Sequence, residues 1–200
     1  GLAIIDISDP TSPGTPVYMD TSGAAMKVTV VGNYAYVADY TSGLAIIDIS
    51  DPTSPGTPVY KDTSGYAVDV TVVGNYAYVA DYASGLAIID ISDPTSPGAP
   101  VYKDTSGYAY GVTVVGNYAY VADYTSGLAI IDISDPTSPG TPVYKDTSGY
   151  AVDVTVVGNY AYVADYASGL AIIDISDPTS PGAPVYKDTS GYAVDVTVVG

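Results

Sequence analysis

The chain has 200 residues, with 22 acidic and five basic side chains, and its formal net charge at neutral pH is -17. This charge repels phosphate backbones and anionic lipid surfaces, so we expect no nucleic-acid binding and no direct membrane insertion. Cys and His are both absent, which excludes disulfides, Cys/His metal centres and nucleophilic triads that use a histidine base.

A ten-residue motif repeats along the chain with a period of 42 residues. It reads Gly-Leu-Ala-Ile-Ile-Asp-Ile-Ser-Asp-Pro and begins at Gly1, Gly43, Gly85, Gly127 and Gly169. Periods of about 40 to 45 residues are typical of propeller blades that contain four strands each. We therefore interpret residues 1–200 as one domain of repeated units, the last of which is truncated.

The first complete unit opens with two predicted strands. Residues 24–31 end in a β-branched apolar run, and residues 34–40 are rich in Tyr and Val. Gly32 and Asn33 lie between them and form a two-residue hairpin signal, which suits a type I′ or type II′ turn.

Two more strands complete the unit. Residues 44–50 form the third strand and residues 59–63 a short fourth strand, while the three prolines of residues 51–58 exclude regular structure between them. The third strand is apolar on both faces, so it must be covered on both sides. No segment has the apolar spacing of a helix. The sequence therefore predicts an all-β propeller of four-stranded antiparallel blades, in which the apolar faces of each blade are buried against the neighbouring blades.

The pattern leaves the number of blades open. The complete predicted blades leave two strands over at residues 1–22 and one strand at residues 192–200. Joining these ends would give a composite blade without its second strand. Its first and third strands would then lie about 10 Å apart, which is too far for direct hydrogen bonds. We expect about five blades, one of them composite or incomplete. Three alternatives stay open: a neighbour supplies the strand, the chain continues, or the blades form an arc of a larger ring.

The repeated runs resemble a known family. The chain is similar to the LVIVD-repeat β-propellers over essentially its full length, in the runs Tyr-Val-Ala-Asp-Tyr, the ten-residue motif and Pro-Val-Tyr. Residues 44–48, Leu-Ala-Ile-Ile-Asp, occupy the position of the five residues that give the family its name. The resemblance implies blades around a central channel and an extracellular or cell-surface location, although this chain carries no signal peptide. It implies no shared catalytic residues.

Aspartate and tyrosine recur at fixed positions, which favours structural roles. We expect Asp48 and its copies to accept amides of an adjacent loop as buried groups, rather than to form a cation-binding ring. Asp39 and its copies could hold Ca²⁺, but no known calcium-loop spacing is present. We expect Tyr34 and Tyr36 to pack against other strands rather than to recognise a ligand. We therefore predict no metal site and no cofactor, with Ca²⁺ as a weak alternative.

The copies differ most at the start of the first strand of each unit. Alternating strand directions place these positions at one mouth of the channel, and strand ends on a rigid scaffold often carry binding sites. Neutral drift explains the differences equally well. The candidate binding residues are Lys27, Asp69, Tyr110, Asp153 and Asp195.

Three functional hypotheses follow, and none of them is enzymatic because no catalytic residues are found. The first is a repeat scaffold, extracellular or on the cell surface, that mediates assembly or adhesion through protein partners or self-association. The second is a module that binds a ligand, cation or partner at the channel mouth. The third is a designed propeller without a biological function.

Overall fold

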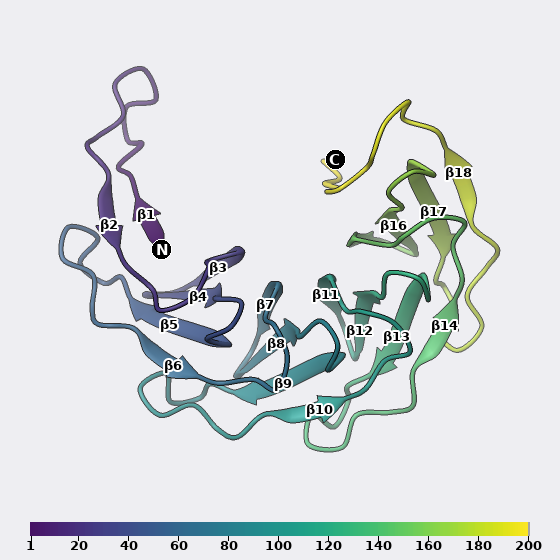
Figure 1. Cartoon of the computed structure of the whole chain (residues 1–200), viewed down its shortest axis with the longest axis horizontal. Coiled ribbons are helices and arrows are strands. Elements are labelled where there is room, and N and C mark those ends of the chain that lie inside the picture. The colour runs from purple at the N-terminus through teal and green to yellow at the C-terminus, as the bar shows by residue number, and fades with distance from the viewer. Residues whose placement is uncertain (200) are drawn as a thin grey trace.

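The computed structural model describes residues 1–199, and this range contains strands and loops but no helix. Four sheets have four strands each, and a fifth sheet has two. The all-β class and the four-stranded antiparallel blades are therefore confirmed. Figure 1 shows the sheets side by side along an open arc, with the two chain ends at its opposite tips.

The strands of each blade follow one another in sequence from the channel outward (Figure 1). Blade 1 comprises β3 (Lys27–Val31), β4 (Tyr34–Ala38), β5 (Leu44–Asp48) and β6 (Val59–Lys61). Blade 2 comprises β7 (Asp69–Val73), β8 (Tyr76–Ala80), β9 (Leu86–Asp90) and β10 (Val101–Lys103). Blade 3 comprises β11 (Gly111–Val115), β12 (Tyr118–Ala122), β13 (Leu128–Asp132) and β14 (Val143–Lys145). Blade 4 comprises β15 (Asp153–Val157), β16 (Tyr160–Ala164), β17 (Leu170–Asp174) and β18 (Val185–Lys187).

The tight turn between the first two strands of each blade takes one of the two predicted forms. Val31 pairs with Tyr34, so Gly32 and Asn33 are the two loop residues. Gly32 has a φ of 58°, whereas Asn33 is not among the described residues with positive φ. A positive φ at the first loop position only is the signature of a type II′ turn, which glycine accommodates without strain.

The strands are shorter than predicted because their ends serve the next blade. The strand predicted over residues 24–31 begins at Lys27. Ala67, the copy of Ala25 in the next unit, instead exchanges two backbone hydrogen bonds of 3.0 Å with Tyr40 of blade 1. Tyr40 has a φ of 49°, which ends the second strand before it. These bridges recur in every blade; they tie blades 1, 2 and 3 to the following blade and blade 4 to the C-terminal segment.

The hydrophobic core lies between the blades rather than within one of them. On one face of each blade, side chains of the second and third strands pack against the first three strands of the following blade. Both faces of the third strand are buried this way, as its two apolar faces predict. Between blades 1 and 2 the core includes Tyr36, Leu44, Ile46, Val70, Val79 and Ile89.

The two tips of the arc carry the leftover strands. At one tip β1 (Leu2–Ile4) and β2 (Val17–Met19) form the N-terminal strand pair, which packs on blade 1. At the other tip the C-terminal segment, residues 192–199, follows blade 4 and is joined to it by a bridge between Ala193 and Tyr166. The two leftover parts do not meet, so the described residues form an arc without a composite blade (Figure 1). Within residues 1–199 there is no helix that could cross a membrane.

Candidate functional site at the channel mouth

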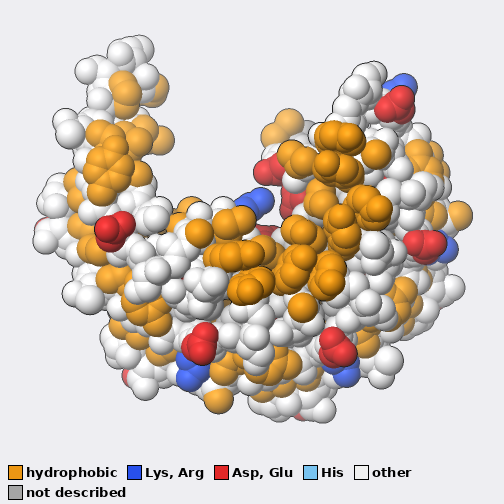
Figure 2. All heavy atoms as spheres, in the orientation of Figure 1, with side chains coloured by type: hydrophobic (Ala, Val, Ile, Leu, Met, Phe, Trp, Pro, Cys, Tyr) orange, Lys and Arg blue, Asp and Glu red, His pale blue; other side chains and the backbone are white. Residues whose placement is uncertain are grey.

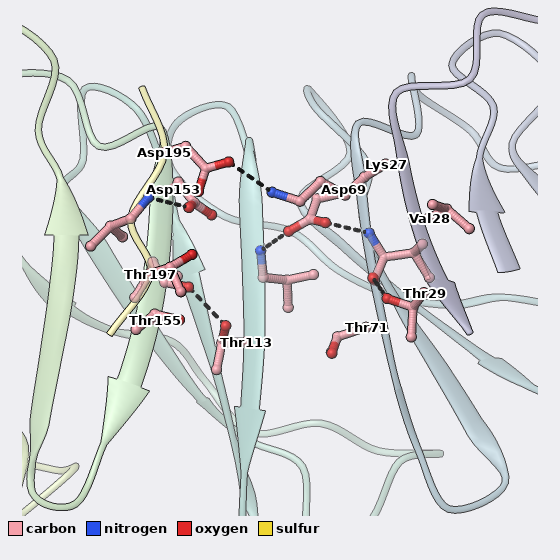
Figure 3. A pocket seen from close by; sticks show the side chains of 14 residues that line it. Lys27, Val28, Thr29, Asp69, Thr71, Thr113, Asp153, Thr155, Asp195 and Thr197 are labelled. Atoms are coloured by element: carbon pink, nitrogen blue, oxygen red, sulfur yellow. Dashed lines mark hydrogen bonds and ion pairs between the residues drawn. The ribbon is translucent and has the colours of Figure 1, made fainter. Parts of the chain in front are cut away.

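The innermost strands of the four blades surround a cavity of about 200 Å³. Its walls come from β3, β7, β11 and β15, and residues 195–197 of the C-terminal segment close one side. A row of threonines runs around this wall, one from each copy of the strand (Figure 3). Thr29 and Thr113 donate to the carbonyl oxygens of Val70 and Val154 on neighbouring inner strands, at 2.7 Å.

The candidate residue Asp69 links two blades. One carboxylate oxygen accepts the Val70 amide and the other accepts the Val112 amide of blade 3, each at 2.8 Å. Burial raises the pKa of Asp69, while these two amides and the Lys27 charge act in the opposite direction. Both oxygens of this buried group are thus already engaged in holding the inner strands together.

Asp153 repeats this link two units later. Its carboxylate accepts the Val196 amide of the C-terminal segment at 2.9 Å. Burial raises the pKa of Asp153 to about 6, against the opposing effects of the Val196 amide and Lys27. Gly111 occupies the intervening copy, where its missing side chain leaves room for Asp153: a Cβ there would lie 3.1 Å from the Asp153 carboxylate.

Lys27 of β3 and Asp195 of the C-terminal segment form an ion pair across the channel. The ammonium lies 3.7 Å from the Asp195 carboxylate, and both side chains are largely exposed (Figure 3). Partial burial lowers the pKa of Lys27, but the charges of Asp153, Asp69 and Asp195 outweigh it and give a net rise. Four of the five candidate residues therefore line one cavity.

Tyr110, the fifth candidate, lies at the same mouth beside a neighbouring cavity that also contacts Lys27, Asp69 and Asp153. Its ring centroid is 5.5 Å from that of Tyr82 and 5.3 Å from that of Tyr124. Burial, followed by the hydrogen bond with Tyr82, raises the pKa of Tyr110 to about 12. Its hydroxyl is therefore neutral at physiological pH.

A continuous row of tyrosines follows the mouth from blade to blade. Stacked pairs with centroids 4.1 to 4.4 Å apart alternate with tilted pairs about 6 Å apart. Figure 2 shows hydrophobic side chains gathered along the concave edge of the arc. The row consists of Tyr40, Tyr66, Tyr82, Tyr108, Tyr124, Tyr150, Tyr166 and Tyr192.

The repeated aspartates accept hydrogen bonds from nearby residues, and the exposure of Asp48 differs from the prediction. Asp48 accepts the Ser50 amide at 2.8 Å, as predicted, but it is exposed, so the expectation of a buried group is wrong. Its partner is two residues away, which keeps the pair at the surface. Asp39 is fully buried and accepts from the Thr21 hydroxyl at 2.6 Å and the Gly23 amide at 2.8 Å. The described residues contain no group of three acidic side chains that could hold a metal ion.

Two contacts in the structure were not predicted from the sequence: the bond from Thr21 to Asp39 and the inter-blade contact of Asp69. The bond from Thr21 to Asp39 has a signal in the sequence, because each copy of Asp39 is preceded 18 residues earlier by threonine. The inter-blade role of Asp69 has no comparable signal, because its position holds Lys, Gly or Asp in different copies. Tyr36 is buried in the core, which agrees with the packing role expected for it, and Tyr34 is partly buried.

Radially stacked four-stranded sheets around an axial channel define a β-propeller architecture. The family model named LVIVD repeat matches residues 1–21, 22–59, 64–100, 106–143 and 148–184. The chain therefore belongs to the LVIVD-repeat family.

Similar solved structures agree on this fold. The β-propeller domain of Myceliophteria thermophila Cps50 (Swd1) is 10% identical with a TM-score of 0.64, and the match covers 86% of this chain and 58% of that one. BamB from Moraxella catarrhalis is 21% identical with a TM-score of 0.59, covering 80% and 48%. The computationally designed Ika4 protein is 10% identical with a TM-score of 0.58, covering 76% and 92%. The chain thus spans about half the length of BamB and of the Cps50 propeller domain. No curated protein matches it.

Proposed function

We propose that the chain is a non-enzymatic repeat scaffold that mediates assembly by docking one tip of the arc onto the opposite tip of another copy. The supporting observation is that the two tips expose side chains which the internal blades bury. Val28 on the N-terminal side of blade 1 is 44% exposed, whereas its copy Val70 is 2% exposed. At the other tip Val185 is 67% exposed, whereas its copy Val59 is partly buried against blade 2.

The two tips are complementary halves of one interface. The face of blade 4 corresponds to the faces that blades 1, 2 and 3 present to their followers, and the N-terminal strand pair corresponds to the outer half of a following blade. A head-to-tail contact of this kind closes into a ring or extends into a filament. Burial of apolar surface favours it by about 25 cal/mol per Å². A role in adhesion, and a location outside the cell or on its surface, rest on the family resemblance.

Self-association should therefore depend on the apolar tip of blade 4. We expect the mean mass measured by light scattering to rise with concentration, and Val185→Asp to return it to that of a single chain because a charge would be buried at the contact. Val157→Asp is the matched control, since Val157 is 46% exposed and its copies Val73 and Val115 remain 45% and 43% exposed although another blade follows each of them. A mass that stays at one chain at the highest attainable concentration contradicts the scaffold proposal.

A second candidate function is a binding module at the channel mouth. The row of tyrosines and Tyr110 support it, since flat aromatic faces on a rigid frame favour ligand or partner contacts. The exposed carboxylate of Asp195 adds an acceptor for a cationic group. A designed propeller without function is the third candidate, and it would show neither self-association nor binding.

We propose that the chain needs no cofactor and that Ca²⁺ does not bind at the mouth. Asp69 and Asp153 already accept backbone amides. We expect a calcium titration, and the addition of a chelator, to shift the melting temperature by less than about 1 °C, because a ligand stabilises only the state that it binds. A rise of several degrees that disappears in an Asp153→Asn, Asp195→Asn double variant would instead identify the mouth as a metal site.

A further inference from the structure

The N-terminal strand pair lacks the two inner strands that every complete blade has. β1 and β2 pair in the register of β5 and β6: Leu2 faces Met19 as Leu44 faces Lys61. In blade 1 the inner edge of β5 is covered by β4, whereas no strand among residues 1–199 pairs with the inner edge of β1. An added strand would lie about 4.8 Å from β1.

The backbone groups along that edge face the empty position. In blade 1 the Ile49 amide donates to the Asn33 carbonyl and the Asp39 amide donates to the Gly43 carbonyl. Odd-numbered residues of this stretch therefore point toward β4, and even-numbered residues point toward β6. The same alternation directs the amides of Ala3 and Ile5 away from β2, and such unpaired edges are templates for another strand.

The floor of the empty position is apolar. A groove of about 250 Å³ lies between β1 and the inner strands of blade 1, and Leu2, Ala3, Ala25, Val28 and Val37 contribute to its walls. At the internal interfaces Tyr36 and Ala38 of the second strand share a buried core with the copy of Val28 in the next blade. The high exposure of Val28 thus marks the place that such a strand covers elsewhere.

We infer that the groove between β1 and β3 accepts one extended segment, supplied by another molecule, with the pattern Tyr-small-Tyr-Val-small of β4. Antiparallel pairing in the register of blade 1 sets its two tyrosines opposite Asp6 and Ile4, and its last small residue opposite Leu2. Main-chain bonds to Ala3 and Ile5 provide affinity, and the tyrosine and small side chains that cover Val28 provide selectivity. This inference deepens the proposed assembly by naming the segment that a tip-to-tip contact leaves vacant.

The experiment uses a fluorescently labelled peptide of residues 33–40, added to the full chain. We expect saturable binding by fluorescence anisotropy, and slower hydrogen exchange at the amides of Ala3 and Ile5 but not at that of Ile4. The same peptide carrying Val37→Pro should bind at least about tenfold more weakly, since Val37 pairs with Ala45 in blade 1 and proline removes that donor.

Variants of the chain locate the binding. Ala3→Pro should weaken the wild-type peptide at least about tenfold by removing an edge amide, and Val28→Thr should weaken it several-fold by placing a hydroxyl under the added strand. Val31→Thr is the matched control, because Val31 is also 44% exposed on β3 but does not line the groove. It should leave the affinity unchanged. Circular dichroism spectra like that of the wild type would show that each variant folds.

Absence of binding at millimolar peptide overturns the inference, and so does binding that Ala3→Pro and Val28→Thr leave unchanged. The outcome is separate from that of the scaffold proposal. Peptide binding by a chain that light scattering shows to be a single molecule would retain the inference and reject the scaffold. Self-association without peptide binding would retain the scaffold and reject the inference.

Discussion

Replacing Asp81 by Ala is expected to lower the free energy of unfolding by about 3 kcal/mol, which is the scale for removing a buried charged acceptor from its donors. Asp81 is fully buried and accepts from the Thr63 hydroxyl at 2.6 Å and from the Gly65 amide at 2.8 Å. Without the carboxylate both donors lose their partner in the contact between blades 1 and 2. Urea denaturation followed by circular dichroism measures the change.

The control for this prediction is Asp90→Ala in the same blade. Asp90 is exposed and accepts the amide of nearby Ser92, which water can reach after the change. Its substitution should alter the urea midpoint far less than that of Asp81. Equal shifts for the two variants would mean that the buried carboxylate does not join the blades in the way the geometry indicates.

Leu86→Ala should also lower the free energy of unfolding by about 3 kcal/mol, through lost burial and the cavity left behind. Leu86 is fully buried in the core between blades 2 and 3. Leu2 occupies the same repeat position in the N-terminal strand pair but is only partly buried. Leu2→Ala should therefore cost about 1 kcal/mol. The difference between the two urea midpoints tests whether stability resides between blades, and equal losses would contradict it.

The architecture could be predicted from the sequence because every unit repeats the same local signals. The Gly32-Asn33 hairpin and the prolines of residues 51–58 divide the unit into strands, and the apolar residues on both faces of residues 44–48 require neighbours on both sides. The grouping of the candidate residues at the channel mouth could also be predicted. Strand direction alone places the copies of Lys27 together, and the structure brings four of the five candidates to one cavity.

Other features depend on geometry that no single unit contains. Whether blades close into a ring depends on the small rotation between successive units, and near-identical sequences are compatible with several values. The early end of the second strand at Ala38 follows from a contact between Tyr40 and the next unit. The row of tyrosines likewise joins residues of successive blades, such as Tyr40 and Tyr66, whose approach is visible only in three dimensions.

The open arc has a mechanical consequence. The hydrophobic cores join each blade to the blades beside it, so a load applied to the two tips is shared by the three contacts between complete blades and the two end contacts in series. The exposed Lys27–Asp195 ion pair is a weak link across the channel in parallel with them. Small rotations at every contact add up to a large displacement of the tips, while each sheet stays intact. We therefore expect the open arc to yield elastically under load, and closure into a ring would remove that compliance.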